Sequence, residues 1–135
     1  MRRLLLWLPA ALFMGVIFYS SSLPDPAPAL TRVILDKVLH MSGYALLGIL
    51  YCVALRGEGL NLTRTMIIAV VLASLYGASD EWHQSFTPHR TADVKDWFAD
   101  TAGGAAGAIA FAGVSAARAA RAFSKASRPQ RQLRR

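Results

Sequence analysis

The stretch DVKDWFADTAGGAAG, residues 93–107, decides how this chain folds. Asp93, Asp96 and Asp100 stand at i, i+3 and i+7, so on a helix they share one face. The glycines of the following GGAAG continue that face, and a GxxxG spacing lets a second helix backbone approach closely. The acidic face therefore turns toward a neighbouring helix, which predicts a polar site between packed helices.

The composition around this stretch indicates a membrane protein. Hydrophobic residues make up 54% of the chain and charged residues only 17%, against about 25% in soluble domains. Apolar runs cover about residues 4–19, 38–55, 66–78 and 97–117, and a membrane-spanning helix needs about 20 such residues. A soluble four-helix bundle is the alternative, but its helices would show polar faces along their length. We expect an all-α, polytopic membrane protein with a bundle of four transmembrane helices.

The charges predict how this bundle is oriented. Arg56, Arg64, the first residues and the basic tail fall on one side of the alternating spans. Cytoplasmic loops carry the excess of Lys and Arg, so both termini are expected in the cytoplasm. The loops 21–36 and 80–95 then face outward, and seven of the eight acidic residues lie on or near that side.

The basic tail accounts for the net charge of +7, and such a charge is also typical of nucleic-acid-binding proteins. It follows a membrane span directly, where basic clusters set topology and attract anionic lipid, and no nucleic-acid motif accompanies it. We therefore expect the lipid bilayer and no nucleic acid as partner. Residues 1–117 are predicted to form the membrane domain, and residues 118–135 a basic cytoplasmic tail that is disordered from about residue 124.

A second polar face lies in DKVLHMSGYALLG, residues 36–48. Lys37, His40, Tyr44 and Gly48 stand at i, i+3, i+7 and i+11, so they share one side of a helix.

A third polar segment, LYGASDEWHQSF, ends the third apolar run. Asp80 and Gln84 are four residues apart and share a face, with Glu81 at its edge. Arg90 follows in a short loop, and its forked donors suit carboxylates or phosphates.

Intramembrane ionisable groups are candidate functional residues because they are costly to bury. The plain alternative is an ion-pair network that only fixes helix register. His83 and His89 are expected to be interfacial loop residues outside the site, and the lone Cys52 to serve packing.

These segments resemble the VanZ-like family, named for a membrane protein associated with teicoplanin resistance. The shared features follow the family's order. They are SSLP after the first run, DKVLHMSGYALLG, DEWHQSF, Arg90 in TPHR, and the pair Asp96 and Asp100 that precedes GGAAG. The resemblance implies ligand-binding candidates, which are Asp36, Lys37, His40, Tyr44, Asp80, Glu81, Gln84, Arg90, Asp96 and Asp100. It also implies helix-packing glycines, which are Gly48, Gly103 and Gly107.

The resemblance places the chain as a multi-pass protein in the inner (cytoplasmic) membrane of a bacterial cell envelope. The first run also fits a cleaved signal peptide with basic residues before it and small residues after it. SSLP follows a retained first helix in the family, so we expect retention. Position 100 departs from the family, because Asp100 stands where many relatives carry Asn.

Three functions remain open at this stage. The favoured one is non-enzymatic: an outer-facing pocket that binds or modulates a lipid-linked wall precursor or a glycopeptide antibiotic, with no metal and no other cofactor. The alternative is an intramembrane hydrolase of a lipid head group. In it, either His40 with Asp80, Glu81 or Asp96 binds a divalent cation, or one carboxylate serves as general base. A transporter is unsupported, because the acidic residues stop in the outer half of the spans. The oligomeric state stays open.

Overall fold

The computed structural model describes residues 2–23, 33–88 and 90–132. They form four helices: α1 (Arg2–Ser21), α2 (Val33–Gly57), α3 (Leu62–Gln84) and α4 (Val94–Gln132), with no strand in the described ranges. The prediction of an all-α chain with four helices is confirmed.

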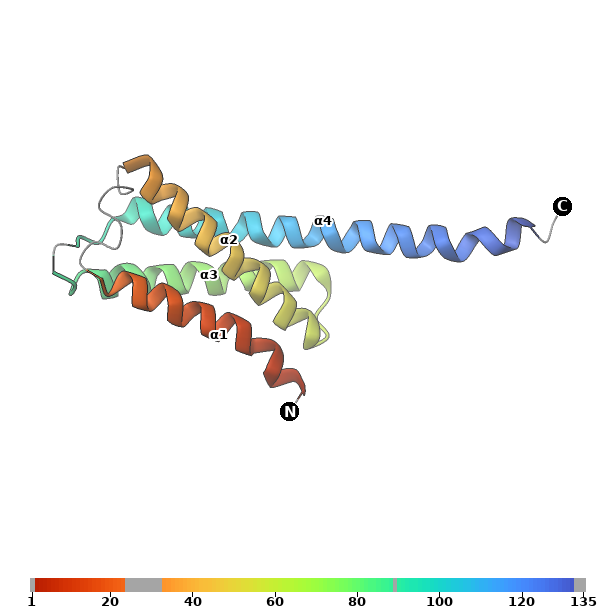
Figure 1. Cartoon of the computed structure of the whole chain (residues 1–135), viewed down its shortest axis with the longest axis horizontal. Coiled ribbons are helices and arrows are strands. Elements are labelled where there is room, and N and C mark those ends of the chain that lie inside the picture. The colour runs from red at the N-terminus through yellow and green to blue at the C-terminus, as the bar shows by residue number, and fades with distance from the viewer. Residues whose placement is uncertain (1, 24–32, 89, 133–135) are drawn as a thin grey trace.

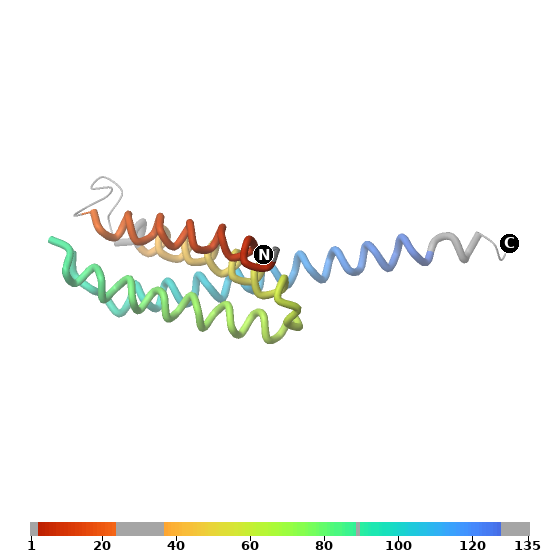
Figure 2. Tube along the Cα trace, turned by 90° about the horizontal axis from the view of Figure 1, so that it is seen from below, coloured from red at the N-terminus to blue at the C-terminus, as the bar shows by residue number. Residues whose placement is uncertain are grey.

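The helices run side by side with their ends in two groups (Figures 1 and 2). The last residues of α1 and α3 and the first residues of α2 and α4 gather at one end, which we call the loop end (Figure 1). At the other end α4 continues well beyond the remaining helices (Figure 2). Which side of the membrane the loop end faces stays a prediction from the charges.

Three described helices are long and apolar enough to cross a membrane, over Arg3–Ser21, Lys37–Gly57 and Leu62–Gln84. Large apolar side chains on them are exposed, such as Leu4 at 75% and Leu75 at 63%, as expected of surfaces that meet lipid. The fourth span stays a prediction. The apolar part of α4 is built mainly of Ala and Gly, which are less hydrophobic than the Leu, Ile and Val of the other helices.

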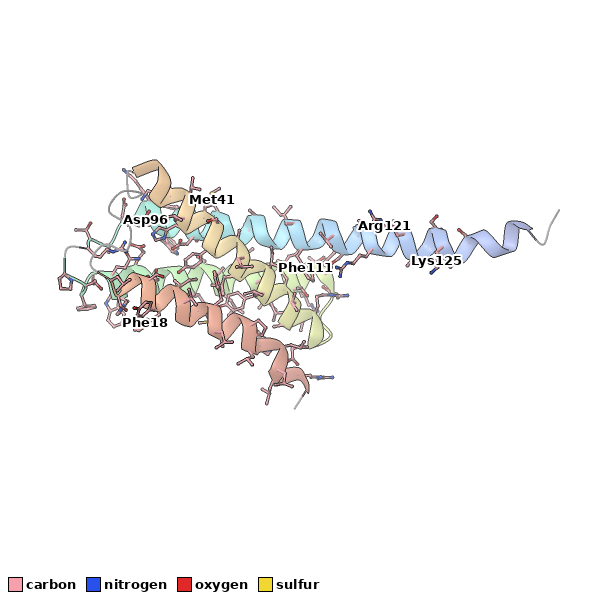
Figure 3. All side chains as sticks on the ribbon, in the orientation of Figure 1. Phe18, Met41, Asp96, Phe111, Arg121 and Lys125 are labelled. Atoms are coloured by element: carbon pink, nitrogen blue, oxygen red, sulfur yellow. The ribbon has the colours of Figure 1, made fainter. Side chains whose placement is uncertain are left out.

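The basic tail differs from the expectation of disorder, because α4 continues as a helix to Gln132. Ala and Arg dominate this segment, and both have high intrinsic helix propensity. Arg121 and Lys125 project from this extension, and its side chains are exposed as far as Ser127 (Figure 3). A domain boundary at 117/118 and a cytoplasmic location for the tail remain predictions.

A tight turn joins α2 to α3 at the end opposite the loop end. Gly59 adopts φ = 89°, a conformation that side-chain-bearing residues rarely take. Asn61 then caps α3 by accepting a hydrogen bond from the Arg64 backbone N–H at 2.9 Å. Trp7 donates its indole N–H to Glu58 Oε1 at 3.2 Å, which fastens α1 to this turn.

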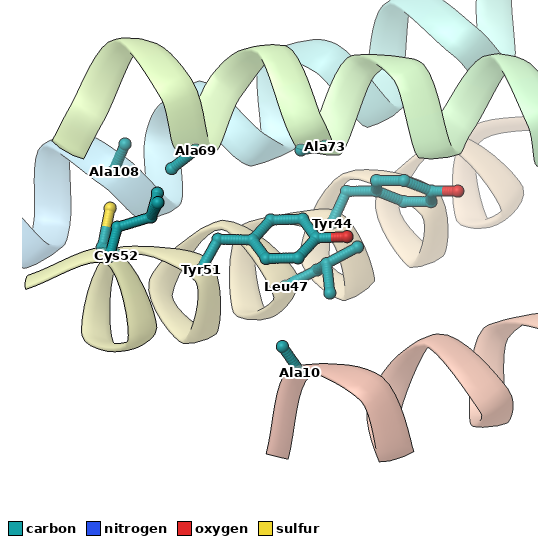
Figure 4. Packing of buried hydrophobic residues seen from close by; sticks show 9 residues of the cluster. Ala10, Tyr44, Leu47, Tyr51, Cys52, Ala69, Ala73 and Ala108 are labelled. Atoms are coloured by element: carbon teal, nitrogen blue, oxygen red, sulfur yellow. The ribbon is translucent and has the colours of Figure 1, made fainter. Parts of the chain in front are cut away.

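The apolar core combines large side chains on α2 with small ones on the facing helices (Figure 4). Leu47, Tyr51 and Cys52 of α2 are buried in one cluster with alanines of α1, α3 and α4. Cys52 is a free thiol in this packing. Small residues let helix backbones approach in a membrane, where apolar surface alone provides no driving force between helices.

Glycines make the α2–α4 contact especially close. A methyl group added at Gly103 would overlap the backbone carbonyl of Met41, and one at Gly107 would overlap that of Ala45. On the α2 side, a methyl group at Gly48 would lie 2.5 Å from the Gly104 carbonyl oxygen. This approach brings the polar face of α2 onto the acidic face of α4 near the loop end. Met41 of α2 and Asp96 of α4 mark the region in Figure 3.

Candidate functional site

The polar site begins at the loop end with a lysine between two aspartates. Lys37 Nζ of α2 forms ion pairs with Asp96 and with Asp93, the latter at 3.3 Å. Asp93 precedes α4 and caps it, accepting the Lys95 backbone N–H at 2.9 Å. This hydrogen bond, together with the Lys37 ammonium, lowers the pKa of Asp93 below its usual range. Asp93 therefore stays ionised and holds Lys37 at the mouth of the site.

One helical turn deeper, α2 and α4 meet through a second pair. His40 Nδ1 lies 2.9 Å from Asp100 Oδ1, and the Asp100 side chain is completely buried. Gly77 of α3 makes room for this carboxylate, because a methyl group at Gly77 would lie 3.0 Å from Asp100 Oδ2. Three helices thus enclose Asp100.

Glu81 reaches the same region from the end of α3. Its Oε2 accepts a hydrogen bond from the Asp93 backbone N–H at 2.7 Å, across the α3–α4 connection. The residue is 7% exposed, so the bond fixes a nearly buried carboxylate. The loop therefore orients a side chain that belongs to the inner part of the site.

Three buried polar atoms in this region have no hydrogen-bond partner among the described residues. They are Tyr44 Oη, Glu81 Oε1 and Asp100 Oδ2, contributed by α2, α3 and α4. Buried polar atoms in folded proteins nearly always have a partner, because leaving one unpaired costs about 1–3 kcal/mol. These oxygens are therefore available to a partner beyond the described residues.

Two of these residues also join His40 in a possible set of metal ligands. One ligand atom each of His40, Glu81 and Asp100 lies within 4.8 Å of the others. Imidazole nitrogen and carboxylate oxygen are ligands that zinc and related cations accept. We refer to Lys37, His40, Tyr44, Glu81, Asp93, Asp96 and Asp100 together as the polar cluster.

The remaining predicted site residues take supporting positions. Gln84 donates to Asp80 Oδ2 at 3.1 Å within α3, and both side chains are buried. Arg90 donates its Nε–H to the Leu23 carbonyl at 3.3 Å, so it reaches the segment after α1 and not a carboxylate of the cluster. Asp36 belongs to α2, but its side chain lies outside the described residues, as does all of His89.

A family model described as VanZ/LLP1 matches residues 5–115. The chain belongs to the VanZ/LLP1 family. The matched residues include most of α1, all of α2 and α3 and the first part of α4, and so contain every residue of the polar cluster. Comparison with curated proteins and with solved structures gives no match. The resemblance drawn from the motifs is confirmed.

Some contacts of this VanZ/LLP1 protein carry no signal in its sequence. The Asp93 backbone N–H donates a hydrogen bond to Glu81. The helical spacing predicts the position of the Asp93 side chain but not this backbone contact. Ser74 accepts hydrogen bonds from Trp97 Nε1 at 3.0 Å and from Thr101 at 2.9 Å, which joins α3 to α4 below the cluster. His83 stacks on Phe18 with ring centroids 4.4 Å apart, a packing position against α1.

Proposed function

We propose that this VanZ/LLP1 membrane protein binds the polar head of an amphipathic envelope molecule at the loop end. A lipid-linked wall precursor or a glycopeptide antibiotic such as teicoplanin has the required chemistry. The observation that supports this proposal is the set of buried oxygens of Tyr44, Glu81 and Asp100 that have no hydrogen-bond partner among the described residues. A protein that only fixed its helix register would pair these atoms internally.

The chemistry of the unpaired atoms selects the ligand class. Carboxylate oxygens accept hydrogen bonds, so the partner must present donors or positive charge. Sugar hydroxyls and peptide amides are such donors, and Tyr44 can donate or accept in return. Hydrogen bonds to an ionised group in a partly dry site are stronger than neutral ones, so a few of them give specificity.

The position of the cluster fits a ligand that arrives through the membrane. The cluster lies near one end of helices whose outer surfaces are apolar, so the proposal includes a fourth span in α4 and a loop end on the outer face of the inner membrane. A lipid-anchored molecule in that leaflet holds its head group at this depth. Arg90, at the same end, is proposed to meet an anionic group of the ligand, because its planar fork suits phosphate and carboxylate.

Binding to the full-length protein in lipid nanodiscs tests the proposal, with teicoplanin and a lipid-linked wall precursor as separate probes. Glu81→Gln, Asp80→Asn and Arg90→Ala should each weaken binding of one of the probes at least tenfold while the protein still inserts into membranes. Arg64→Ala is the matched control, because Arg64 is exposed at the opposite end of the bundle. Equal binding of both probes by wild type and all three site variants would contradict the proposal.

Hydrolysis of a lipid head group is the second candidate. The approach of His40, Glu81 and Asp100 favours it, because these residues would hold a cation that would polarise a phosphoryl oxygen and activate a water. Release of phosphate or of the free head group from the lipid-linked probe separates the two functions. Product that forms with wild type and not with Glu81→Gln favours the hydrolase, whereas binding without product favours the receptor.

A further inference from the structure

We infer that His40, Glu81 and Asp100 form a binding site for one divalent metal ion of the zinc class. The metal site stands on the geometry of these residues and does not depend on the proposed function. Each ligand comes from a different helix, α2, α3 and α4, so a bound ion would join three elements of the bundle.

The spacing of the ligand atoms is close to that of a tetrahedral site. Zinc binds nitrogen and oxygen at about 2.0–2.1 Å, so neighbouring ligand atoms in a tetrahedron lie about 3.3 Å apart. His40 Nδ1 and Asp100 Oδ1 are 2.9 Å apart, and the three ligand atoms lie within 4.8 Å of one another. The His40–Asp100 distance is near the tetrahedral value, and a bound ion would draw the three ligand atoms to that spacing.

Charge balance favours an ion at this position. Glu81 and Asp100 together bring two carboxylates into a place where Asp100 is completely buried and Glu81 nearly so. A divalent cation with a neutral imidazole neutralises both carboxylates, whereas a protonated His40 neutralises only one. The ion also gives a partner to Glu81 Oε1, a buried acceptor that has none among the described residues.

The ligand types select among cations. Mg²⁺ and Ca²⁺ prefer sites made of oxygen alone, whereas one imidazole with two carboxylates suits Zn²⁺, Mn²⁺ or Fe²⁺. Metal sites also orient their ligands through hydrogen bonds from the surrounding protein. Here the Asp93 backbone N–H holds Glu81 Oε2 at 2.7 Å, which leaves Oε1 as the ligand atom.

Three protein ligands leave one position of a tetrahedral ion open. Tyr44 Oη, buried and unpaired in the same cluster, lies on α2 one turn below His40. An anionic oxygen of the head group would occupy the open position and accept a hydrogen bond from Tyr44. This last step rests on the proposed function, and the metal site itself does not.

Metal content of the full-length protein in nanodiscs tests the inference. The protein is stripped with chelator, dialysed against Zn²⁺, Mn²⁺ or Mg²⁺, washed, and its metal measured by mass spectrometry. We expect about one Zn²⁺ or Mn²⁺ per chain, no retained Mg²⁺, and at least a tenfold loss of bound metal in His40→Ala and in Glu81→Gln. Glu81→Gln keeps the size of the side chain and so guards against a folding defect as the cause.

Matched controls separate this site from a histidine and a carboxylate outside the polar cluster. His83→Ala removes a histidine that packs on Phe18, and Glu58→Gln removes a carboxylate in the α2–α3 turn. Both variants should retain the metal. A wild-type protein that holds no Zn²⁺ or Mn²⁺ overturns the inference, as does equal loss from His83→Ala and His40→Ala. If metal binds and both head-group probes fail to bind, the metal site stands and the proposed function fails.

Discussion

His40 Nδ1 of α2 lies 2.9 Å from Asp100 Oδ1 of α4, although 60 residues separate the two in the chain. Asp100 is completely buried, so this contact provides a polar partner for a carboxylate that has no access to water. The His40–Asp100 pair therefore joins α2 to α4 and also belongs to the polar cluster, so a change in either residue should affect both helix packing and the site.

A double-mutant cycle on this pair measures that dependence. His40→Gln and Asp100→Asn, alone and together, should show a coupling energy of about 1–2 kcal/mol, because either single change leaves the other partner buried with a weaker interaction. Reversible unfolding in mixed detergent micelles, with chelator present, provides the free energies. Changes that add within about 0.5 kcal/mol would show that the two side chains do not interact.

The glycine contact between α2 and α4 predicts a difference between two substitutions on one helix. Gly107→Ala should lower the free energy of unfolding by about 1–3 kcal/mol, because the added methyl group overlaps the backbone carbonyl of Ala45. Gly113→Ala adds the same methyl group where nothing lies within 4 Å, so it should leave stability unchanged or raise it by up to about 1 kcal/mol. Equal effects in the same unfolding assay would contradict the α2–α4 contact.

Lys37 should stabilise the mouth of the site through its charge. Lys37→Met leaves Asp93 and Asp96 facing each other without a cation, and we expect a loss of about 1 kcal/mol, since Lys37 and Asp93 are partly exposed. Lys37→Arg keeps the charge and should lose less. The difference between the two variants should shrink at high salt, and an effect independent of both charge and salt would argue for packing instead.

The orientation of the bundle is tested by chemical labelling in intact cells. In a Cys52→Ala background, Thr91→Cys places a thiol in the exposed α3–α4 connection, and Ser127→Cys places one on the exposed part of α4. A membrane-impermeant maleimide added outside should label position 91 at once and position 127 only after permeabilisation. The reverse pattern would place the polar cluster on the cytoplasmic side and remove the proposed envelope ligand.

The fold was largely predictable because helix number depends on apolar runs, which are local in the sequence. Helix lengths are less local: the third apolar run covers only residues 66–78, fewer than the about 20 residues of a span, yet α3 covers Leu62–Gln84. Polar residues extend it at both ends, with Asn61 capping the start and Asp80 bonded to Gln84 near the finish. The basic charge of the tail favours disorder from about residue 124, whereas the helix propensity of Ala and Arg favours the helix that α4 continues to Gln132.

Helical periodicity predicts the positions of the site residues that lie on helices. It gives no information on the contacts made by residues in the loop between α3 and α4. The spacing of Lys37, His40 and Tyr44 placed them on one face, and the structure brings Lys37 and His40 to aspartates of α4. The forked donors of Arg90 suit carboxylates or phosphates, but a loop residue has no periodicity that predicts its direction, and Arg90 donates to the Leu23 carbonyl. Likewise, no pattern indicates that a backbone N–H would hold Glu81.

Distances between labelled side chains in a lipid bilayer test the central claim, that ionisable residues of three helices gather in one buried cluster. Solid-state NMR on the full-length protein, with ¹⁵N in histidine rings and ¹³C in aspartate and glutamate carboxyls, reports such distances through dipolar dephasing. We predict strong dephasing between a histidine nitrogen and a carboxyl carbon that disappears in His40→Gln and persists in His83→Ala. If the dephasing survives in His40→Gln, or is absent from the wild type, His40 does not contact the carboxylates and the cluster does not exist.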